Sequence, residues 1–281
     1  MTSNIDPKTI DLRHAREVAI DASGRASDLL RRRFGTPMEV SSKGHADFVT
    51  ELDEQCEEII REVLNDFDDS IAFMGEETSK FETEGNKVQI HVPSTCWIVD
   101  PLDGTSNYSH SFNAFAVSIG LLVDDELAVG VVQAPITGEL LHATKNQGAF
   151  REHLTGAEPA KLSTVDGGNH FNIFSTSVPF RQPEYIAEHM ELISKAFNYF
   201  EDIRRVGSAA LDLSWVAGGS WAAFVELFLK PWDIAAGGLL VTEAGGVITD
   251  FTGNEKDWLT NGQVAASANA RVHEIVLSLI E

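Results

Sequence analysis

The spacing of apolar residues changes once along the chain, and this change limits the folds that the chain can adopt. Apolar residues recur at helical intervals from Asp6, which precedes Pro7, as far as Gly35, and again from about Thr50 to Asn65. Beyond residue 70 the spacing becomes strand-like, over residues 71–74, 96–99, 115–123, 127–133 and 140–144. Two helices followed by a meander of strands predict an α+β fold with an antiparallel sheet.

The remainder of the chain alternates between the two types of spacing. It predicts strands over residues 171–175 and 221–227, and helices over residues 183–196, 208–216, 231–244 and 272–280. No strong periodicity survives near residues 156–165. We therefore expect an N-terminal α+β half over residues 1–160 and a C-terminal α/β half over residues 161–281.

Composition narrows the class of protein. The chain of 281 residues is 43% hydrophobic and 23% charged, which is typical of a soluble globular protein. Its longest apolar stretch, Ala114 to Val123, is about half as long as a membrane span, and its first residues have no secretory pattern. Cys56 and Cys96 lack metal-ligand spacing and fit core positions. We expect a cytoplasmic protein with no membrane partner.

The formal net charge of -22 predicts that the chain has no nucleic-acid partner, because a nucleic-acid surface needs clustered Lys and Arg side chains to replace counterions. The same charge is compatible with phosphate chemistry. An acidic protein that handles an anion needs cations to reverse the local field, so the charge also suggests a bound divalent metal.

Acidic side chains stand at the end of an apolar strand. Residues 97–99 lead to Asp100, and Pro101 is expected to end the strand because it has no amide donor. Asp103 follows. The two carboxylates and the Leu102 carbonyl are oxygen ligands of the kind that Mg²⁺ prefers.

The turn after these acids has the residues of a phosphate-binding loop. Gly104 permits a tight turn, and Thr105 is typical of the start of a helical turn, whose amides suit phosphate oxygens. Glu76 follows the strand over residues 71–74, and Asp233 lies in the first turn of the helix over residues 231–244. Acids gathered in this way repel one another unless a cation is present. Coincidence is the alternative, because the chain has 43 acidic residues.

The spacing of Asp100 and Asp103 bears on the mechanism. In phosphatases of the haloacid-dehalogenase type, one residue separates the nucleophilic aspartate from the acid/base aspartate. Here two residues separate the acids, so the second side chain points in a different direction. We therefore expect Asp100 to be a metal ligand rather than a phosphorylated nucleophile.

The chain resembles the inositol monophosphatases over nearly its whole length. The motifs that carry the resemblance are, in order, Lys43 to Thr50, Gly75-Glu76-Glu77, Trp97 to Tyr108, Gly207-Ser208-Ala209-Ala210, Pro231 to Gly237 and Val241 to Gly246. The resemblance implies a layered αβαβα sandwich, as in fructose-1,6-bisphosphatase. It also implies a lithium-sensitive, magnesium-dependent phosphatase that forms a homodimer.

For the metals, the resemblance implies two or three Mg²⁺ ions. Glu76, Asp100 and the Leu102 carbonyl would hold one ion. Asp100, Asp103 and Asp233 would hold a second, and a third, weaker ion would depend on Glu76.

For catalysis, the resemblance implies direct attack by a metal-activated water without a covalent enzyme intermediate. Thr105, paired with Asp53, and Glu76 would orient and deprotonate this water, and the amides of Gly104 and Thr105 would hold the phosphate. The alternative for Asp53 is a solvated helix position.

Substrate recognition is expected around Glu226, which lies within an apolar strand where an unpaired buried charge is costly. The resemblance implies that Glu226 accepts hydrogen bonds from inositol hydroxyls, together with Ala209, Asp103 and Asp233. A position on the wet side of an edge strand is the alternative. Phe228 departs from the family pattern, in which a small residue is expected, and this puts the inositol assignment in question.

The implied function is hydrolysis of inositol 1-phosphate or of a similar small polyol phosphate. Histidinol phosphate, a sugar bisphosphate and NADP are alternative substrates within the superfamily. A role mainly as a non-catalytic binding partner is a further alternative, since some bacterial relatives join transcription complexes.

Overall fold

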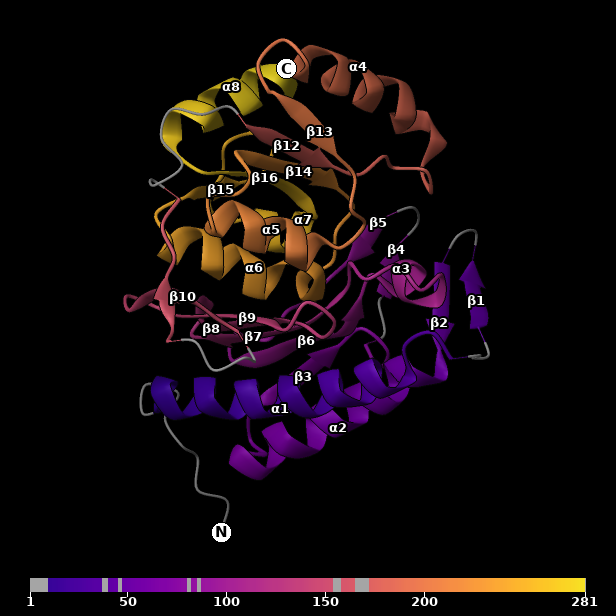
Figure 1. Ribbon diagram of the computed structural model, residues 1–281, viewed down its shortest axis with the longest axis vertical. Helices are drawn as coiled ribbons and strands as arrows, with labels where there is room; N and C mark the ends of the chain where they lie inside the picture. The colour runs from indigo at the N-terminus through magenta and orange to yellow at the C-terminus, as the bar shows by residue number, and fades with distance from the viewer. Residues whose placement is uncertain are drawn as a thin grey trace.

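Helices and sheets alternate in five layers in the computed structural model, which describes residues 10–36, 40–44, 47–79, 82–84, 87–153, 158–164 and 172–280 (Figure 1). Two helices cover one face of a seven-stranded sheet, and two more lie between it and a five-stranded sheet. A final helical layer covers the outer face of that second sheet. The predicted α+β class and the αβαβα sandwich are both confirmed.

The first layer consists of α1 (Leu12–Arg33) and α2 (Glu51–Phe67). Helix α1 begins at Asp11, whose side chain accepts hydrogen bonds from the Arg13 and His14 amides, so the helix starts later than the predicted Asp6. Asp6 itself lies outside the described residues. Small side chains line the buried face of α1, which lets the helix pack closely on the sheet.

The seven-stranded sheet has the order β11-β10-β9-β8-β7-β6-β3. Its strands are β3 (Ala72–Gly75), β6 (Cys96–Asp103), β7 (Ala116–Val123), β8 (Glu126–Ala134), β9 (Glu139–Thr144), β10 (Gly148–His153) and β11 (Ala160–Lys161). All neighbouring pairs are antiparallel except β3 and β6, which are parallel. The predicted meander is therefore confirmed, with two further strands at its end.

Two short hairpins were not predicted. They are β1 (Val40–Gly44) with β2 (Asp47–Thr50), and β4 (Glu82–Glu84) with β5 (Lys87–Gln89). The motif from Lys43 to Thr50 lies in the first of them, except for residues 45 and 46, which are outside the described residues.

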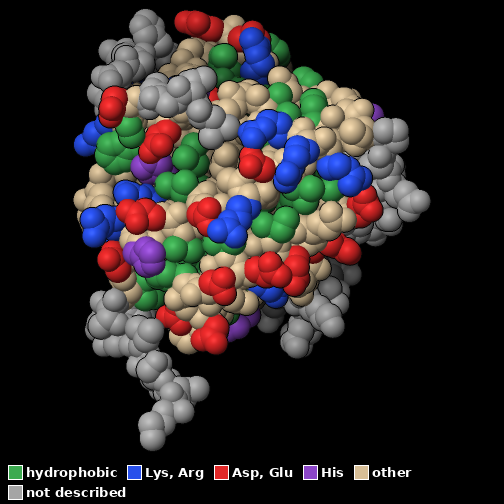
Figure 2. Space-filling model, turned by 60° about the horizontal axis from the view of Figure 1, so that its bottom comes forward, with side chains coloured by type: hydrophobic (Ala, Val, Ile, Leu, Met, Phe, Trp, Pro, Cys, Tyr) green, Lys and Arg blue, Asp and Glu red, His purple; other side chains and the backbone are tan. Residues whose placement is uncertain are grey.

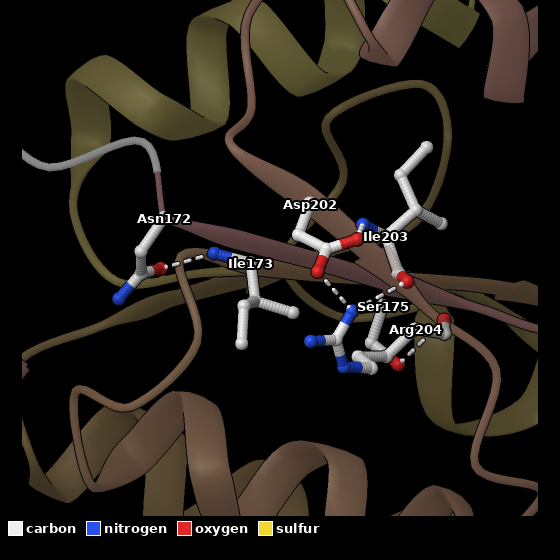
Figure 3. A network of polar contacts seen from close by, with 6 residues as sticks. All are labelled: Asn172, Ile173, Ser175, Asp202, Ile203 and Arg204. Carbon is white, nitrogen blue, oxygen red and sulfur yellow. Dashed lines mark hydrogen bonds and ion pairs between the residues drawn. The ribbon is translucent and has the colours of Figure 1, made fainter.

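The second sheet has the order β13-β12-β14-β16-β15. Its strands are β12 (Ile173–Thr176), β13 (Asp202–Arg204), β14 (Ala223–Leu227), β15 (Val247–Thr249) and β16 (Gln263–Ser267). The outer layer contains the short 3-10 helix η3 (Pro183–Tyr185), α4 (Ile186–Ala196) and α8 (Ala270–Ile280). At the sheet edge, Ser175 Oγ lies 3.2 Å from the Arg204 carbonyl oxygen (Figure 3).

The central layer is formed by α5 (Ala209–Ala217) and α6 (Pro231–Glu243), with the short helices α3 (Thr105–Ser109) and α7 (Trp258–Asn261) nearby. Helix α6 contacts both sheets. Gly130 permits its approach to β8, since a Cβ atom there would lie 2.7 Å from the Ala236 carbonyl oxygen. The predicted division at residue 160 remains a prediction, and its boundary region includes residues outside those described.

Among the described residues, no helix combines the length and the apolar character that a membrane crossing requires.

Candidate active site

The candidate site begins at an irregularity in β6. The carboxylate of Asp100 is buried, and its Oδ1 accepts a 2.9 Å hydrogen bond from the Leu102 amide. The pairing of β6 with β7 shifts between Asp100 and Asp103, so residues 101 and 102 leave the ladder and the strand resumes at Asp103. The prediction that Pro101 ends the strand is therefore wrong. A local bulge accommodates the missing amide donor.

Thr105 joins this irregularity to the first helical layer. Its Oγ1 lies 3.1 Å from Asp53 Oδ1 and 3.1 Å from the Leu102 carbonyl oxygen, and its single proton can serve one of them at a time. Asp53 is fully buried on α2, which excludes the solvated position considered for it. The structure thus brings together the predicted Thr105 and Asp53 pair.

Asp103 is held by the start of α5. Its Oδ2 accepts hydrogen bonds from Ser208 Oγ at 2.6 Å and from the Ala210 amide at 2.8 Å. The Ala209 amide also bonds to this carboxylate, which places Ala209 at Asp103. Burial raises the pKa of Asp103 to about 6, although the bonds from Ser208 and Ala210 lower it.

Gly104 forms the turn between Asp103 and α3 with a φ of 96°. Such a backbone conformation favours glycine. A Cβ atom would also lie 3.1 Å from the Ala114 carbonyl oxygen and 3.3 Å from that of Gly207. The absence of a side chain therefore lets the turn approach two other segments.

Glu76 lies in the turn that follows β3, and its amide donates to the Val99 carbonyl at 3.1 Å. Glu57, which sequence reasoning missed, supports this turn. It is buried on α2, its Oε2 accepts from the Glu77 amide at 2.8 Å, and its Oε1 accepts from Arg61 at 2.7 Å. Its spacing of four residues from Asp53, which places both on one face of α2, was the available signal.

Asp233 lies in the first turn of α6, where its Oδ2 accepts a 2.7 Å bond from the Lys230 amide. Burial and the charge of Asp103 raise the pKa of Asp233 to about 7. The pKa of Asp100 is raised well above its usual range by burial, and further by the charges of Glu76, Asp103 and Asp233. Four predicted metal ligands thus share one region and repel one another.

The side chains of Asp100, Asp103, Asp233 and Glu76 are suitable ligands for a hard divalent cation such as Mg²⁺, because such ions prefer carboxylate oxygens. Asp103 and Asp233 each have an oxygen bonded to a backbone amide. Within the described part of the chain, no three side chains of the metal-binding types are placed so as to enclose an ion already. The carboxylates that could bind an ion therefore lie in one region, but their side chains would have to reorient to surround the ion.

Glu226 belongs to β14, which lies between β12 and β16, so the edge-strand alternative is wrong. Burial raises the pKa of Glu226 to about 8, and the charges of Asp233 and Asp103 contribute. A hydrogen bond from the Ser177 side chain and the charge of Arg205 oppose this rise in pKa. Glu226 therefore faces the same acidic region as the predicted metal ligands.

Asp212 is a second acid that sequence reasoning missed. It is buried in the first turn of α5, and Ser175 Oγ lies 2.6 Å from its Oδ1. Burial raises the pKa of Asp212 well above its usual range, and the charges of Glu226 and Asp103 add to this. Ser175 Oγ has one proton, which can serve the Asp212 carboxylate or the Arg204 carbonyl at one time (Figure 3).

Two relatives are similar in sequence to almost the whole chain. It is 38% identical over 265 residues to the Nus factor SuhB of Escherichia coli strain K12, with 93% of each chain covered. It is 36% identical over 263 residues to the inositol-1-monophosphatase of Caulobacter vibrioides, with 92% of this chain and 97% of the relative covered.

The first of these names corrects one expectation. The prediction of no nucleic-acid partner is wrong, because relatives named Nus factor match 93% of the chain. That name fits the alternative of a binding partner in a transcription complex. Net charge is a sum over the whole chain and does not describe how the charges are distributed over the surface. Figure 2 shows a face on which Lys and Arg side chains are interspersed with Asp and Glu side chains.

Solved structures and a sequence model of a protein family point to the same family. The suhB protein of Bartonella henselae has a TM-score of 0.82 at 31% identity, with 95% of this chain and 98% of that chain covered. An IMPase/NADP phosphatase described as complexed with Mg²⁺ and phosphate shares the fold at 22% identity, with a TM-score of 0.78 and 96% of each chain covered. The model of the inositol monophosphatase family matches residues 11–281. The chain therefore belongs to the inositol monophosphatase family.

Proposed function

We propose that the chain is a magnesium-dependent phosphomonoesterase that hydrolyses a small polyol phosphate, with inositol 1-phosphate as the first candidate. The proposal rests mainly on the shared location of Asp100, Asp103, Asp233 and Glu76. Burial raises the pKa of Asp100, and the charges of the other three acids raise it further. Several carboxylates gathered in one region, two of them buried and two half-buried, are costly in the absence of a cation. Membership of the family supports a phosphatase.

The metal ligands are proposed as two sets. Glu76, Asp100 and the Leu102 carbonyl would hold one Mg²⁺, and Asp100, Asp103 and Asp233 would hold a second. A weaker third ion would depend on Glu76. Magnesium bound there would stabilise the negative charge on the transferred phosphoryl group and on the leaving oxygen. The Leu102 carbonyl lies 3.1 Å from Thr105 Oγ1, which connects this ligand to the proposed catalytic pair.

Residues of the chain would also activate the water and bind the substrate. Thr105, bonded to Asp53, and Glu76 orient the attacking water and accept its proton. The amides of Gly104 and Thr105 bind phosphate oxygens. Glu226 binds hydroxyl groups of the alcohol part, and Ala209 orients Asp103 for the same task.

The decisive test is magnesium-dependent phosphate release from inositol 1-phosphate, histidinol phosphate, fructose 1,6-bisphosphate and NADP, with and without lithium. We expect inositol 1-phosphate to have the highest kcat/KM, lithium to inhibit, and Asp100→Asn to abolish release while circular dichroism shows an intact fold. Full activity in excess chelator would refute the magnesium-dependent mechanism. If inositol 1-phosphate had the lowest kcat/KM, only its assignment as the substrate would be refuted.

A second function is supported by the relatives named Nus factor SuhB, namely partnership in a transcription complex. The two functions are separable. A catalytically inactive Asp100→Asn chain that still performs the cellular role would favour partnership over catalysis. For the enzyme we propose a cytoplasmic location, in keeping with Cys56 and Cys96, which are buried free thiols.

A further inference from the structure

Phe228 has an unusual backbone conformation. Its φ is 67°, in the left-handed region that bulky side chains rarely adopt. The other non-glycine residues with positive φ in the described part of the chain are Ser111, Asp124, Asp125 and Asn146, which are all small or polar. A strained bulky residue beside a candidate site is grounds for a functional hypothesis, because a glycine would fit the position without strain.

The ring of Phe228 is held by a second aromatic ring. Tyr185, at the end of η3, lies with its ring centroid 5.0 Å from that of Phe228, at an interplanar angle of 67°. Edge-to-face geometry at this distance is favourable. Both side chains remain partly exposed, at 37% for Phe228 and 40% for Tyr185, so the pair lies at the surface.

This ring contact joins two segments that follow neighbouring strands. Strands β12 and β14 are parallel, and Thr176 pairs with Val225, so the segments after these strands begin at the same edge of the sheet. Tyr185 then contacts Phe228. Phe228 follows Glu226 of the proposed alcohol site and precedes Asp233 of the proposed metal sites, so the aromatic pair lies beside those sites.

We propose that Phe228 and Tyr185 form an aromatic clasp that limits the size of the alcohol part of the substrate. The inference rests on the proposed phosphatase function and adds a specificity-determining pair to it. Small polyol monophosphates pass the clasp, whereas esters with a second phosphate or a nucleotide collide with the rings. The limit comes from volume, because overlap with a packed ring is repulsive whatever the charge of the ligand.

Two cationic side chains lie at the segment that carries Tyr185. The guanidinium carbons of Arg181 and Arg205 each lie 5.6 Å from the centroid of the Phe180 ring, five residues before Tyr185. A second phosphate group would find these guanidinium groups attractive. Removal of the Phe228 ring should therefore admit bisphosphates rather than merely weaken the binding of small esters.

The test measures kcat/KM with magnesium for inositol 1-phosphate, fructose 1,6-bisphosphate and NADP. In Phe228→Gly we expect the ratio of the larger esters to inositol 1-phosphate to rise by about tenfold or more. Tyr185→Ala should raise the ratio less, because the Phe228 ring remains. Phe228→Tyr keeps a ring, and Phe197→Ala removes an exposed aromatic side chain from the end of α4, so neither should change the ratio.

Three outcomes would overturn the clasp. The first is a ratio within about twofold of wild type in a folded Phe228→Gly chain. The second is a ratio that changes only together with the oligomeric state in gel filtration, which would assign the rings to an interface. The third is a wild-type chain inactive with every ester, which refutes the phosphatase as well. Activity with an unaltered ratio refutes the clasp alone.

Discussion

Thr105 Oγ1 lies 3.1 Å from Asp53 Oδ1, and this contact ties helix α2 to the turn that begins α3. The two residues are 52 positions apart in the sequence. A buried carboxylate can hold a hydroxyl in one orientation, because the carboxylate accepts and cannot rotate freely within the core. The pair is therefore suited to direct a lone pair of Thr105 toward a water molecule.

Replacement of Asp53 by Asn tests this orientation. The amide keeps the shape but introduces a donor and removes the charge, so we expect kcat to fall by about 10²- to 10⁴-fold with little change in KM. Glu54→Gln, an exposed neighbour on α2, should leave kcat unaltered. An Asp53→Asn chain with wild-type kcat would show that Thr105 needs no such partner.

Magnesium should stabilise the folded chain through the four acids. In thermal unfolding, we expect the midpoint of the wild type to rise by about 5 °C or more when the ion concentration reaches about 100 times its Kd. Asp233→Asn should lose most of this rise, whereas Asp125→Asn, in an exposed turn, should keep it. An equal rise in both variants would place the bound ion elsewhere.

Buried histidines predict an acid-sensitive fold. Burial lowers the pKa of His189 below 6.5, and its Nε2 lies 2.8 Å from Thr176 Oγ1. Because Thr176 donates to the Val225 carbonyl, the neutral Nε2–H of His189 donates to Thr176. The folded chain thus binds fewer protons than the unfolded chain, so this contribution is present above pH 6.5 and is lost as the pH falls from 6.5 through the lowered pKa of the folded chain.

The experiment compares the free energy of unfolding in urea at pH 7.5 and at pH 5.5. The wild type should lose more stability on acidification than His189→Gln, since glutamine keeps a donor and does not titrate. His110→Gln, at an exposed position, should behave as the wild type does. Equal losses in the wild type and in His189→Gln would contradict the prediction.

Because α6 packs closely on β8, we expect that adding even a methyl group at Gly130 lowers the stability of the fold. In Gly130→Ala the new Cβ atom meets backbone atoms of Ala236, which cannot rotate away, so we expect a loss of about 1–3 kcal/mol in the free energy of unfolding. Gly24→Ala is the matched control in α1, because its nearest contact would be at 4.0 Å. It should be neutral or stabilising by up to about 1 kcal/mol. If Gly130→Ala proved as stable as the wild type, the layer contact would be looser than described.

The fold was predictable from sequence where one face of an element is apolar. The stripe of α2 is of this type, because burial of one face imposes a period on the sequence. Strands β7 to β9 are buried on both faces between helical layers, and they are visible in the sequence as apolar runs. Short elements such as the β1–β2 hairpin lack enough residues to show a period. The start of α1 was misplaced because Asp6-Pro7 and Asp11 are both suitable helix starts.

The candidate site was only partly predictable. Asp100, Asp103 and Thr105 stand together in the sequence, so their proximity follows from chain connectivity. Asp212 is distinguished from the other acidic residues only by burial, which depends on contacts with distant segments, whereas Glu57 has the further signal of its spacing from Asp53. The contact of Tyr185 with Phe228 likewise arises from the fold and leaves no local pattern.

The bonds from Ser208 and the Ala210 amide to Asp103 have a practical consequence. They cross the proposed border at residue 160, so a fragment ending there would lose the donors that hold this carboxylate. Two separately expressed fragments should be inactive alone and recover phosphate release when they reassociate. Phosphate release would then report the association of two proteins that are fused to the two fragments.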